Sequence, residues 1–401
     1  MLNTMDTITA TATPTPAPVA SPYCRKNPFL AELLRHDRLT GPGSSKDTRH
    51  FVLNLNGSGL TYAPGDSLGT FGRNSPAVVD ELVSLLGFNP NAAVKDPKGQ
   101  PITLRETLLR DYTVNRANRK IMSGLAQRVG QGEPRNRLME IVDNNYLLCA
   151  YTDTRDYVDI LKEFPDVRFE SPEAFLAQLT PVVPRLYSIA SSPDAHPGEV
   201  HLCVAVVRYD THGRPKKGLA SGFLADHTEV FVRNIPVYVQ ESRTFRLPKD
   251  NSTDIIMCGP GAGIAPFRAF LEQRLLEGAA GRNWLLFGEQ HRATDFLYGQ
   301  ELLQYQAQGG LHRLDLAFSR DQAHKVYVQH RLREAAAELW DWLQNGAYFY
   351  VCGDAKHMAK DVHQTLIDIA QRAGGLSSEA AADYVNVTLM KTEKRYLRDV
   401  Y

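Results

Sequence analysis

The chain has 401 residues, of which 43% are hydrophobic and 22% are charged, and its 45 basic side chains balance 45 acidic ones. This length allows two or three domains of ordinary globular composition, and the balanced charge argues against a protein that binds nucleic acid. No apolar run is long enough to cross a bilayer, no secretory signal pattern opens the chain, and the five cysteines lack metal-ligand spacing. We therefore expect a cytoplasmic protein with free thiols that binds neither membrane nor metal.

The first half of the chain predicts β structure interrupted by helices. Residues 1–24 are rich in Thr, Ala and Pro, which predicts a disordered tail. Alternating segments at 50–55 and 60–62 predict antiparallel strands of a barrel or sandwich, and further strand patterns occur at 183–192, 200–209 and 229–239. Between them, helical spacing predicts an insertion over 75–179. Its expected helices begin near Ser75 and continue at 104–109, 117–129, 137–146, 157–164 and 172–179.

The second half, from about Asn251, alternates strands with helices, which predicts a doubly wound parallel sheet. The expected strands are 254–258, 283–287, 313–318 and 348–352, and the longest expected helices are 328–343 and 357–372. The chain thus divides into two halves of a β domain at 25–74 and 180–248, a helical insertion at 75–179, and a parallel-sheet domain at 249–401.

A strand, a glycine turn and a helix follow one another at 254–274. The apolar run Ile255–Cys258 is followed by glycines at 259, 261 and 263, and Pro266 suits the first turn of a helix. Glycines allow close approach of a ligand to the backbone, and the helix start favours an anion. This unit therefore suggests a dinucleotide pyrophosphate site, although such a turn by itself is often only a turn.

Two further clusters follow strands of the expected parallel sheet, where ligands of such sheets bind. Gly353-Asp354 follows one strand, and Ser319-Arg320 follows another, with Lys325, Tyr327 and Gln329 close behind. Two cations and two hydroxyls suit the 2′-phosphate of NADPH better than the ribose of NADH. The alternative is that Arg320 and Lys325 are ordinary solvated charges.

The β domain offers a second set of candidate ligand-binding groups. Arg185 suits a phosphate, Tyr187 a flat ring and Ser188 a ring nitrogen, whereas the helix start at 218–221 suits a pyrophosphate. The same tetrapeptide is often purely structural. The terminal Tyr401 either frays or lies over a cofactor ring.

Several motifs together resemble the ferredoxin–NADP⁺ reductase family. They are SSKDTRH (44–50), RLYSIASS (185–192), GLAS (218–221), GPGAGIAPFRAF (259–270), SRDQAHKVYVQ (319–329), YVCGDAKHMAKD (350–361) and the terminal RDVY (398–401). They are most similar to its diflavin branch, and within it to the FAD/NADPH module of the flavoprotein subunits of NADPH-dependent sulfite reductases. The resemblance extends over about residues 27–401 and implies an antiparallel barrel with a helical insertion, followed by the NADP-binding domain.

The resemblance also implies roles for individual residues. Those implied to hold FAD are Thr113, Arg185, Leu186, Tyr187, Ser188, Cys203, Val204, Ala205, Tyr209, Gly218, Leu219, Ala220 and Ser221. Those implied to hold NADPH are Gly259, Gly261, Ala262, Gly263, Ser319, Arg320, Lys325, Tyr327, Gln329 and Asp361. Ser188, Cys352 and Asp399 match the polar group at the hydride-transfer site, and Tyr401 matches the aromatic residue that shields the flavin.

Two features depart from the family pattern. Only a short tail precedes the reductase module, where the diflavin relatives carry a flavodoxin-like FMN domain, so we expect electrons to leave for a separate acceptor. Ala262 stands where the family usually has Thr, which removes a hydroxyl near the nicotinamide.

The resemblance therefore implies an FAD-dependent NADPH reductase whose acceptor is a sulfite reductase haemoprotein, a flavodoxin or a ferredoxin. The alternatives are a ferredoxin reductase with flux toward NADPH, or a non-catalytic flavin-binding scaffold subunit. Arg110, Arg116, Arg119 and Lys120 form either a docking patch for an acidic carrier or an ordinary solvated face.

Overall fold

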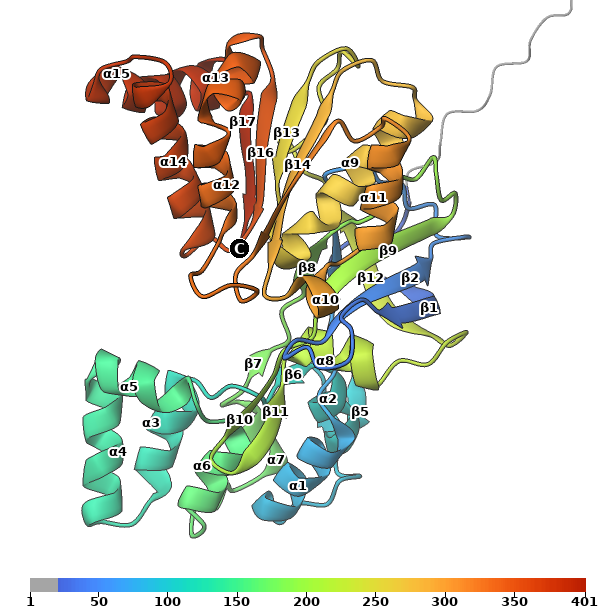
Figure 1. Ribbon diagram of the computed structural model, residues 1–401. Helices are drawn as coiled ribbons and strands as arrows, with labels where there is room; N and C mark the ends of the chain where they lie inside the picture. The colour runs from blue at the N-terminus through green and yellow to red at the C-terminus, as the bar shows by residue number, and fades with distance from the viewer. Residues whose placement is uncertain (1–20) are drawn as a thin grey trace, which may run out of the picture.

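The computed structural model describes residues 21–401. Residues 1–20 of the tail expected over 1–24 therefore lie outside the described residues. The chain forms an antiparallel sheet, a layer of helices and a parallel sheet. Figure 1 shows the helices of the insertion at one end of the molecule and the parallel sheet at the other, with the antiparallel sheet between them.

The antiparallel sheet has six strands and is built from both halves of the expected β domain. Its order across the sheet is β8 (Arg185–Ser188), β3 (Ser67–Thr70), β12 (Arg233–Gln240), β1 (Phe29–Arg38), β2 (Thr48–Asn54) and β9 (Glu199–Ala205). An isolated antiparallel bridge joins Ile189, directly after β8, to Leu202 in β9, so the two edge strands approach each other. Alternating apolar residues of β1, β2, β9 and β12 bury one face of this sheet in a core of its own.

The helical insertion lies between β3 and β8 and has a separate apolar core. Its helices are α1 (Pro76–Leu86), α2 (Leu104–Arg110), α3 (Arg119–Arg128), α4 (Glu133–Asp143), α5 (Asn145–Thr152), α6 (Tyr157–Glu163) and α7 (Pro172–Leu176). The expected helix 137–146 is wrong, because Asn144 leaves the helical conformation and its side chain caps α5 by accepting from two backbone N–H groups. Two short strand pairs complete the insertion: β4 (Ala93–Lys95) with β5 (Pro101–Thr103), and β6 (Tyr112–Thr113) with β7 (Thr180–Pro181).

Two β expectations need correction. Residues 60–62 form no strand, and the segment 200–209 does not form one long strand. It ends as β9 at Ala205, and the chain then forms a separate hairpin of β10 (Arg208–Thr211) and β11 (Arg214–Lys217) that reaches into the helical layer.

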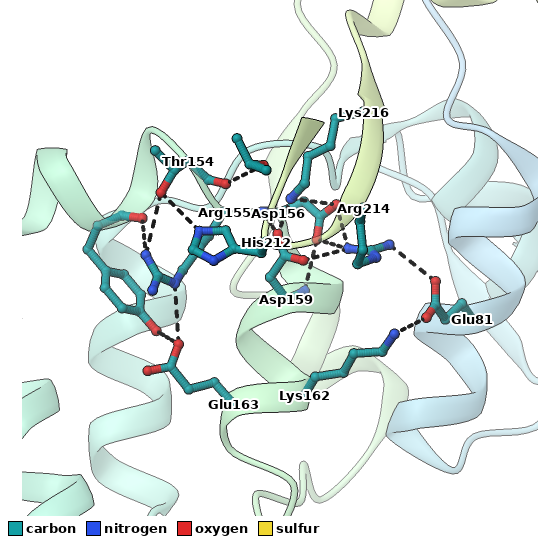
Figure 2. A network of polar contacts seen from close by, with 12 residues as sticks. Glu81, Thr154, Arg155, Asp156, Asp159, Lys162, Glu163, His212, Arg214 and Lys216 are labelled. Carbon is teal, nitrogen blue, oxygen red and sulfur yellow. Dashed lines mark hydrogen bonds and ion pairs between the residues drawn. The ribbon is translucent and has the colours of Figure 1, made fainter. Parts of the chain in front are cut away.

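Ion pairs attach this hairpin to the helices (Figure 2). Arg214 donates to Asp156 at 2.8 Å and to Asp159 at 2.8 Å, and Lys216 pairs with the same two carboxylates. Asp156 and Asp159 also form the capping box of α6, so one pair of carboxylates both starts the helix and holds the hairpin.

The parallel sheet has five strands in the order β15 (Arg313–Phe318), β14 (Asn283–Glu289), β13 (Ile255–Cys258), β16 (Tyr348–Gly353) and β17 (Tyr396–Val400). Apolar cores cover both of its faces, as the expected doubly wound fold requires. Its helices are η1 (Gly261–Ile264), α9 (Ala265–Leu276), α10 (Arg292–Asp295), α11 (Gly299–Ala307), α12 (Val328–Glu334), α13 (Ala336–Gln344), α14 (Met358–Arg372), α15 (Ser378–Asp383) and η2 (Tyr384–Thr392). The single helix expected over 328–343 is wrong, because the chain breaks at Ala335 into α12 and α13.

One short helix completes the description. The short helix α8 (Leu219–Asp226) begins directly after its N-cap residue Gly218, within the helix start expected at 218–221. Among the described residues, no helix is both long and apolar enough to cross a membrane.

Candidate active site between the two sheets

The glycine turn after β13 is shaped by how closely it packs on β16. Gly261 has φ of 60°, a conformation that favours glycine, and it begins the single turn η1 that leads into α9. A Cβ on Gly263 would lie 2.2 Å from the carbonyl oxygen of Cys352, and one on Gly259 would lie 2.5 Å from the carbonyl oxygen of Gly263. These glycines bring the start of α9 against the end of β16, which is the expected strand–turn–helix unit.

Three polar groups named from the sequence meet at this point, each from a different strand. The Ser188 hydroxyl at the end of β8 donates to Asp399 Oδ2 at 2.6 Å, and the Cys352 thiol of β16 lies 3.8 Å from the same oxygen. Asp399 belongs to β17, which pairs in parallel with β16 and sets Asp399 opposite Cys352. One carboxylate thus links a serine of the antiparallel sheet to a cysteine of the parallel sheet.

The buried Cys352 thiol and its neighbour Cys203 stay protonated at physiological pH. Burial, followed by the nearby Asp399 carboxylate, raises the pKa of Cys352 well above its usual value. Burial likewise raises the pKa of Cys203 to about 12. Neither side chain is therefore a thiolate nucleophile, and Cys352 is suited to be a small neutral group beside a bound ring.

Tyr401 is held by its backbone rather than frayed. Its N–H donates to the Gly353 carbonyl at 3.1 Å, and its own carbonyl accepts from the Ala355 N–H at 3.1 Å. Its side chain remains 55% exposed and lines a cavity next to Ser188.

This first cavity has a volume of about 580 Å³ and combines exposed apolar surface with a phosphate-binding end. Leu186, Val207 and Tyr401 are 46%, 50% and 55% exposed, although side chains of this kind are usually buried. Arg185 and the start of α8 at Gly218 supply a cation and free N–H groups. These features fit a flat isoalloxazine ring followed by a pyrophosphate. The expected FAD residues in the lining are Arg185, Leu186, Tyr187, Ser188, Cys203, Ala205, Gly218, Leu219, Ala220, Ser221 and Tyr401, and Ala262 joins them.

A second cavity of about 580 Å³ opens at the carboxyl ends of β13, β14 and β15. The expected NADPH residues in its lining are Gly261, Ser319, Arg320, Lys325, Tyr327, Gln329 and Asp361. Gln329 donates to Asp361 Oδ2 at 3.1 Å and the Ser319 hydroxyl donates to the Glu289 carbonyl at 3.3 Å, which orients these side chains. Arg320 and Lys325 therefore share one concave site, as a 2′-phosphate pocket requires.

Sequence reasoning missed part of this second cavity. Lys46 lines it from the loop before β2 and pairs with Glu289 of β14 at 2.6 Å. Gln290 and His357, which were also missed, lie in the lining, together with Asp354 of the expected Gly353-Asp354 cluster. Lys46 falls within the SSKDTRH motif, so the signal existed, but nothing local in the sequence connects it with the far end of β14.

Other expected site residues lie outside both cavity linings. Thr113 is in β6, Val204 is buried in the core of the antiparallel sheet, and Tyr209 is 40% exposed on β10. Gly259 and Gly263 act through close packing, as described above. Their proposed contacts with a cofactor remain predictions.

Two of the four cations of the expected basic patch, Arg110 and Arg116, pair with carboxylates. Arg110 pairs with Asp96 and Asp111, and Arg116 pairs with Asp153 at 2.5 Å. Arg119 donates to the Val142 carbonyl and to Asn145. These contacts favour a solvated face over a docking patch.

Comparison with known proteins identifies two domain families in the chain. The FAD binding domain matches residues 21–223, and the Oxidoreductase NAD-binding domain matches residues 257–364. Three curated relatives are named sulfite reductase [NADPH] flavoprotein alpha-component. That of Bacillus subtilis is 45% identical over 382 residues, that of Mannheimia succiniciproducens is 44% identical over 379 residues, and that of Yersinia pestis is 43% identical over 381 residues. These matches cover 95%, 94% and 95% of this chain but 62%, 62% and 61% of the relatives, so the chain spans about three-fifths of their length.

Proposed function

Because the chain belongs to the FAD binding domain family, we propose that it is an NADPH-dependent flavoprotein reductase that passes electrons to a separate acceptor. The observation that carries the proposal is the meeting of Ser188, Cys352 and Asp399 beside the first cavity, which Ser188 lines, together with a second cavity that Arg320 and Lys325 line. Bound FAD would supply the capacity to accept a hydride and to release single electrons.

The residues of the chain position the two dinucleotides and shape the charge around the transfer. Hydride transfer requires two rings in contact, so orientation and the exclusion of water carry most of the catalysis. Arg185 and Gly218–Ser221 would hold the FAD pyrophosphate, and Arg320 and Lys325 the 2′-phosphate. The Asp399 carboxylate would stabilise the positive charge that develops on the nicotinamide, and Ser188 holds that carboxylate in place. Tyr401 would cover the flavin face until the nicotinamide arrives.

The proposal also includes the closure of the antiparallel sheet into a barrel and the boundaries of the domains. The bridge between Ile189 and Leu202 supports a small barrel rather than an open sheet. The proposed divisions are an FAD domain at 25–74 and 180–248, a connecting domain at 75–179 and an NADP domain at 249–401.

The proposed acceptor is a sulfite reductase haemoprotein subunit, because the relatives carry the name of a sulfite reductase flavoprotein component. A flavodoxin or a ferredoxin is the alternative acceptor. Adding each carrier to the NADPH-reduced protein without oxygen, and following reoxidation of the flavin, would separate these candidates.

Reduction of the flavin by NADPH, the first proposed step, can be tested directly. The protein is loaded with FAD, made anaerobic and mixed with NADPH or NADH while the flavin absorbance is recorded. We expect NADPH to bleach the flavin, and Arg320→Ala to raise the NADPH concentration at half-maximal rate by about tenfold or more, since an Arg–phosphate contact is lost.

The matched control is Arg333→Ala, which removes an exposed arginine outside the cavity lining. This variant should change neither the NADPH nor the NADH concentration at half-maximal rate of flavin reduction. A flavin that stays oxidised with NADPH would refute the reductase and favour the scaffold alternative, and equal effects of both variants would refute the 2′-phosphate site.

A further inference from the structure

Outside both cavities, the turn that leads into β9 gathers side chains that the proposed reaction does not use. One donor atom from each of His196, Glu199 and His201 lies within 4.8 Å of the other two. The His196 and His201 rings have centroids 4.2 Å apart. His201 is 3% exposed, whereas the side chains of His196 and Glu199 are 30% and 36% exposed, so the group is open to solvent on one side.

Local backbone geometry produces this grouping. Glu199 and His201 are alternate residues of one strand, so they project from the same face. Before them, Gly198 has φ of 77°, and the Glu199 N–H donates to the His196 carbonyl at 3.1 Å. This tight turn folds His196 back over the strand.

The hydrogen bonds leave the two imidazoles suited to bind a cation. His201 Nε2 lies 3.1 Å from Glu199 Oε2, so these two proposed ligand atoms are already close together. His196 Nε2 lies 3.0 Å from Glu272 Oε1, which leaves Nδ1 as the donor for an ion. A carboxylate that holds the outer nitrogen of a histidine is the usual support of a metal-binding imidazole.

Carboxylates balance the guanidinium that shares Glu272 with His196. Arg268 pairs with Glu272 at 2.8 Å and with Glu301 at 2.9 Å.

We propose that His196, Glu199 and His201 form a binding site for one Zn²⁺ ion, with water as the fourth ligand. Two imidazoles and one carboxylate suit Zn²⁺ better than Mg²⁺ or Ca²⁺, which prefer oxygen ligands. Tetrahedral Zn²⁺ with bonds of about 2.0–2.1 Å holds its ligand atoms about 3.4 Å apart, so ligand atoms that are now up to 4.8 Å apart need to approach by up to about 1.4 Å. The ion would replace the hydrogen bond between Glu199 and His201.

The position of the site suggests a structural role. His196 is held by Glu272 of α9, and the backbone N–H of Ser192 donates to the same carboxylate at 2.8 Å. The bound ion would therefore fasten the start of β9, in the antiparallel sheet, to the helix that follows the glycine turn of the parallel sheet. The ion would stabilise the seam without contact with either dinucleotide.

Zn²⁺ binding to the FAD-loaded protein tests this proposal. The protein is treated with a chelator, freed of it, and titrated with Zn²⁺ against a chromophoric competitor. We expect one ion per chain and a higher unfolding temperature with Zn²⁺ than without it. Co²⁺ in the same site should give the visible absorption of a tetrahedral ion, and Mg²⁺ should not compete.

Two conservative variants of partly exposed ligands provide the specificity test. His196→Asn and Glu199→Gln should each weaken Zn²⁺ binding by about tenfold or more and abolish the gain in unfolding temperature. His324→Asn removes an exposed histidine elsewhere and should bind Zn²⁺ like the unmodified protein. Flavin content and the unfolding temperature in chelator check that the variants are folded. Absence of binding, or equal binding by all variants, would overturn the site.

Discussion

At the scale of single residues, the distance between the glycine turn and β16 leaves no room for a side chain. The Gly263 Cα faces the Cys352 carbonyl, and the clash for a Cβ is with backbone, which cannot rotate away. Accommodating a methyl group therefore requires the turn and β16 to separate, at the place where Cys352 meets Asp399.

Gly263→Ala should accordingly destabilise the FAD-loaded protein by about 1–3 kcal/mol, the usual cost of overpacking. The measurement is the free energy of unfolding in urea. Gly130→Ala is the control, because its new Cβ has no atom within 4 Å and its φ is not positive. It should change the free energy by less than about 0.5 kcal/mol. Equal stability of the two variants would contradict the close packing.

Asp399→Asn should slow anaerobic flavin reduction by NADPH by about 10²-fold, because the amide cannot neutralise positive charge on the nicotinamide. The NADPH dissociation constant should change little, since Asp399 lies outside the lining of the second cavity. Asp166→Asn, an exposed carboxylate in the helical layer, should have no effect on either quantity. A reduction rate that Asp399→Asn leaves unchanged would remove the carboxylate from the chemistry.

At the scale of elements, the β10–β11 hairpin depends on the carboxylates at the start of α6 (Figure 2). Burial of Asp159 raises its pKa, but hydrogen bonds from Lys216 and Arg214 outweigh burial and lower it to about 2. The folded pKa therefore lies below the unfolded value of about 3.9. The resulting stability is present above about pH 4 and is lost as the pH falls toward 2.

Because the pKa of Asp159 is lower in the folded protein than in the unfolded chain, acid should weaken the attachment of the hairpin to α6. The free energy of unfolding should fall more steeply between pH 4 and pH 2.5 in the unmodified protein than in Asp159→Asn, which cannot gain that proton. Asp153→Asn removes an exposed carboxylate paired with Arg116 and should keep the steep dependence. Identical pH profiles for Asp159→Asn and the unmodified protein would exclude Asp159 as the group responsible.

Elements with a strong local pattern were predictable, and those formed by distant pairing were not. The apolar run at 255–258, its glycines and the following helix carry their structure in adjacent residues, and the model confirms the strand and the helix. β17 is five residues long and carries two charges, and it forms only because β16 offers an unpaired edge. Asn144 and Ala335 interrupt helices whose apolar spacing continues through them, so periodicity alone placed those helix ends wrongly.

In the candidate site too, residues close in sequence were predictable, and contacts between distant segments were not. Ser319, Arg320 and Lys325 follow one strand, so the sequence placed them together correctly. The approach of Ser188, Cys352 and Asp399 joins three distant segments and followed only from the family resemblance. Lys46 was missed because its partner Glu289 lies on another domain.

At the scale of the whole molecule, the loop between β1 and β2 joins the two sheets. The Gly41 N–H donates to the Thr294 carbonyl at 2.7 Å, Ser44 pairs with Asp295, and Lys46 pairs with Glu289. The Glu289 side chain is 3% exposed, so loss of Lys46 would leave a buried carboxylate with a hydrogen bond from the Gln290 N–H but without its cation.

Lys46→Met should therefore reduce the free energy of unfolding by about 1–3 kcal/mol and weaken NADPH binding. Urea unfolding and a coenzyme titration measure the two effects. Lys98→Met, at an exposed position outside the cavity linings, should affect neither. A stability loss with unaltered coenzyme binding would show that Lys46 acts only as an attachment.

Lys46 belongs both to this attachment and to the wall of the second cavity, which is the proposed coenzyme site. Under that proposal, docking of the loop and binding of the coenzyme are thermodynamically linked. A nucleotide that gains affinity from the docked loop must hold that loop docked by the same free energy. The attachment between the two sheets would then be stronger when reduced coenzyme is plentiful in the cell and weaker when it is scarce.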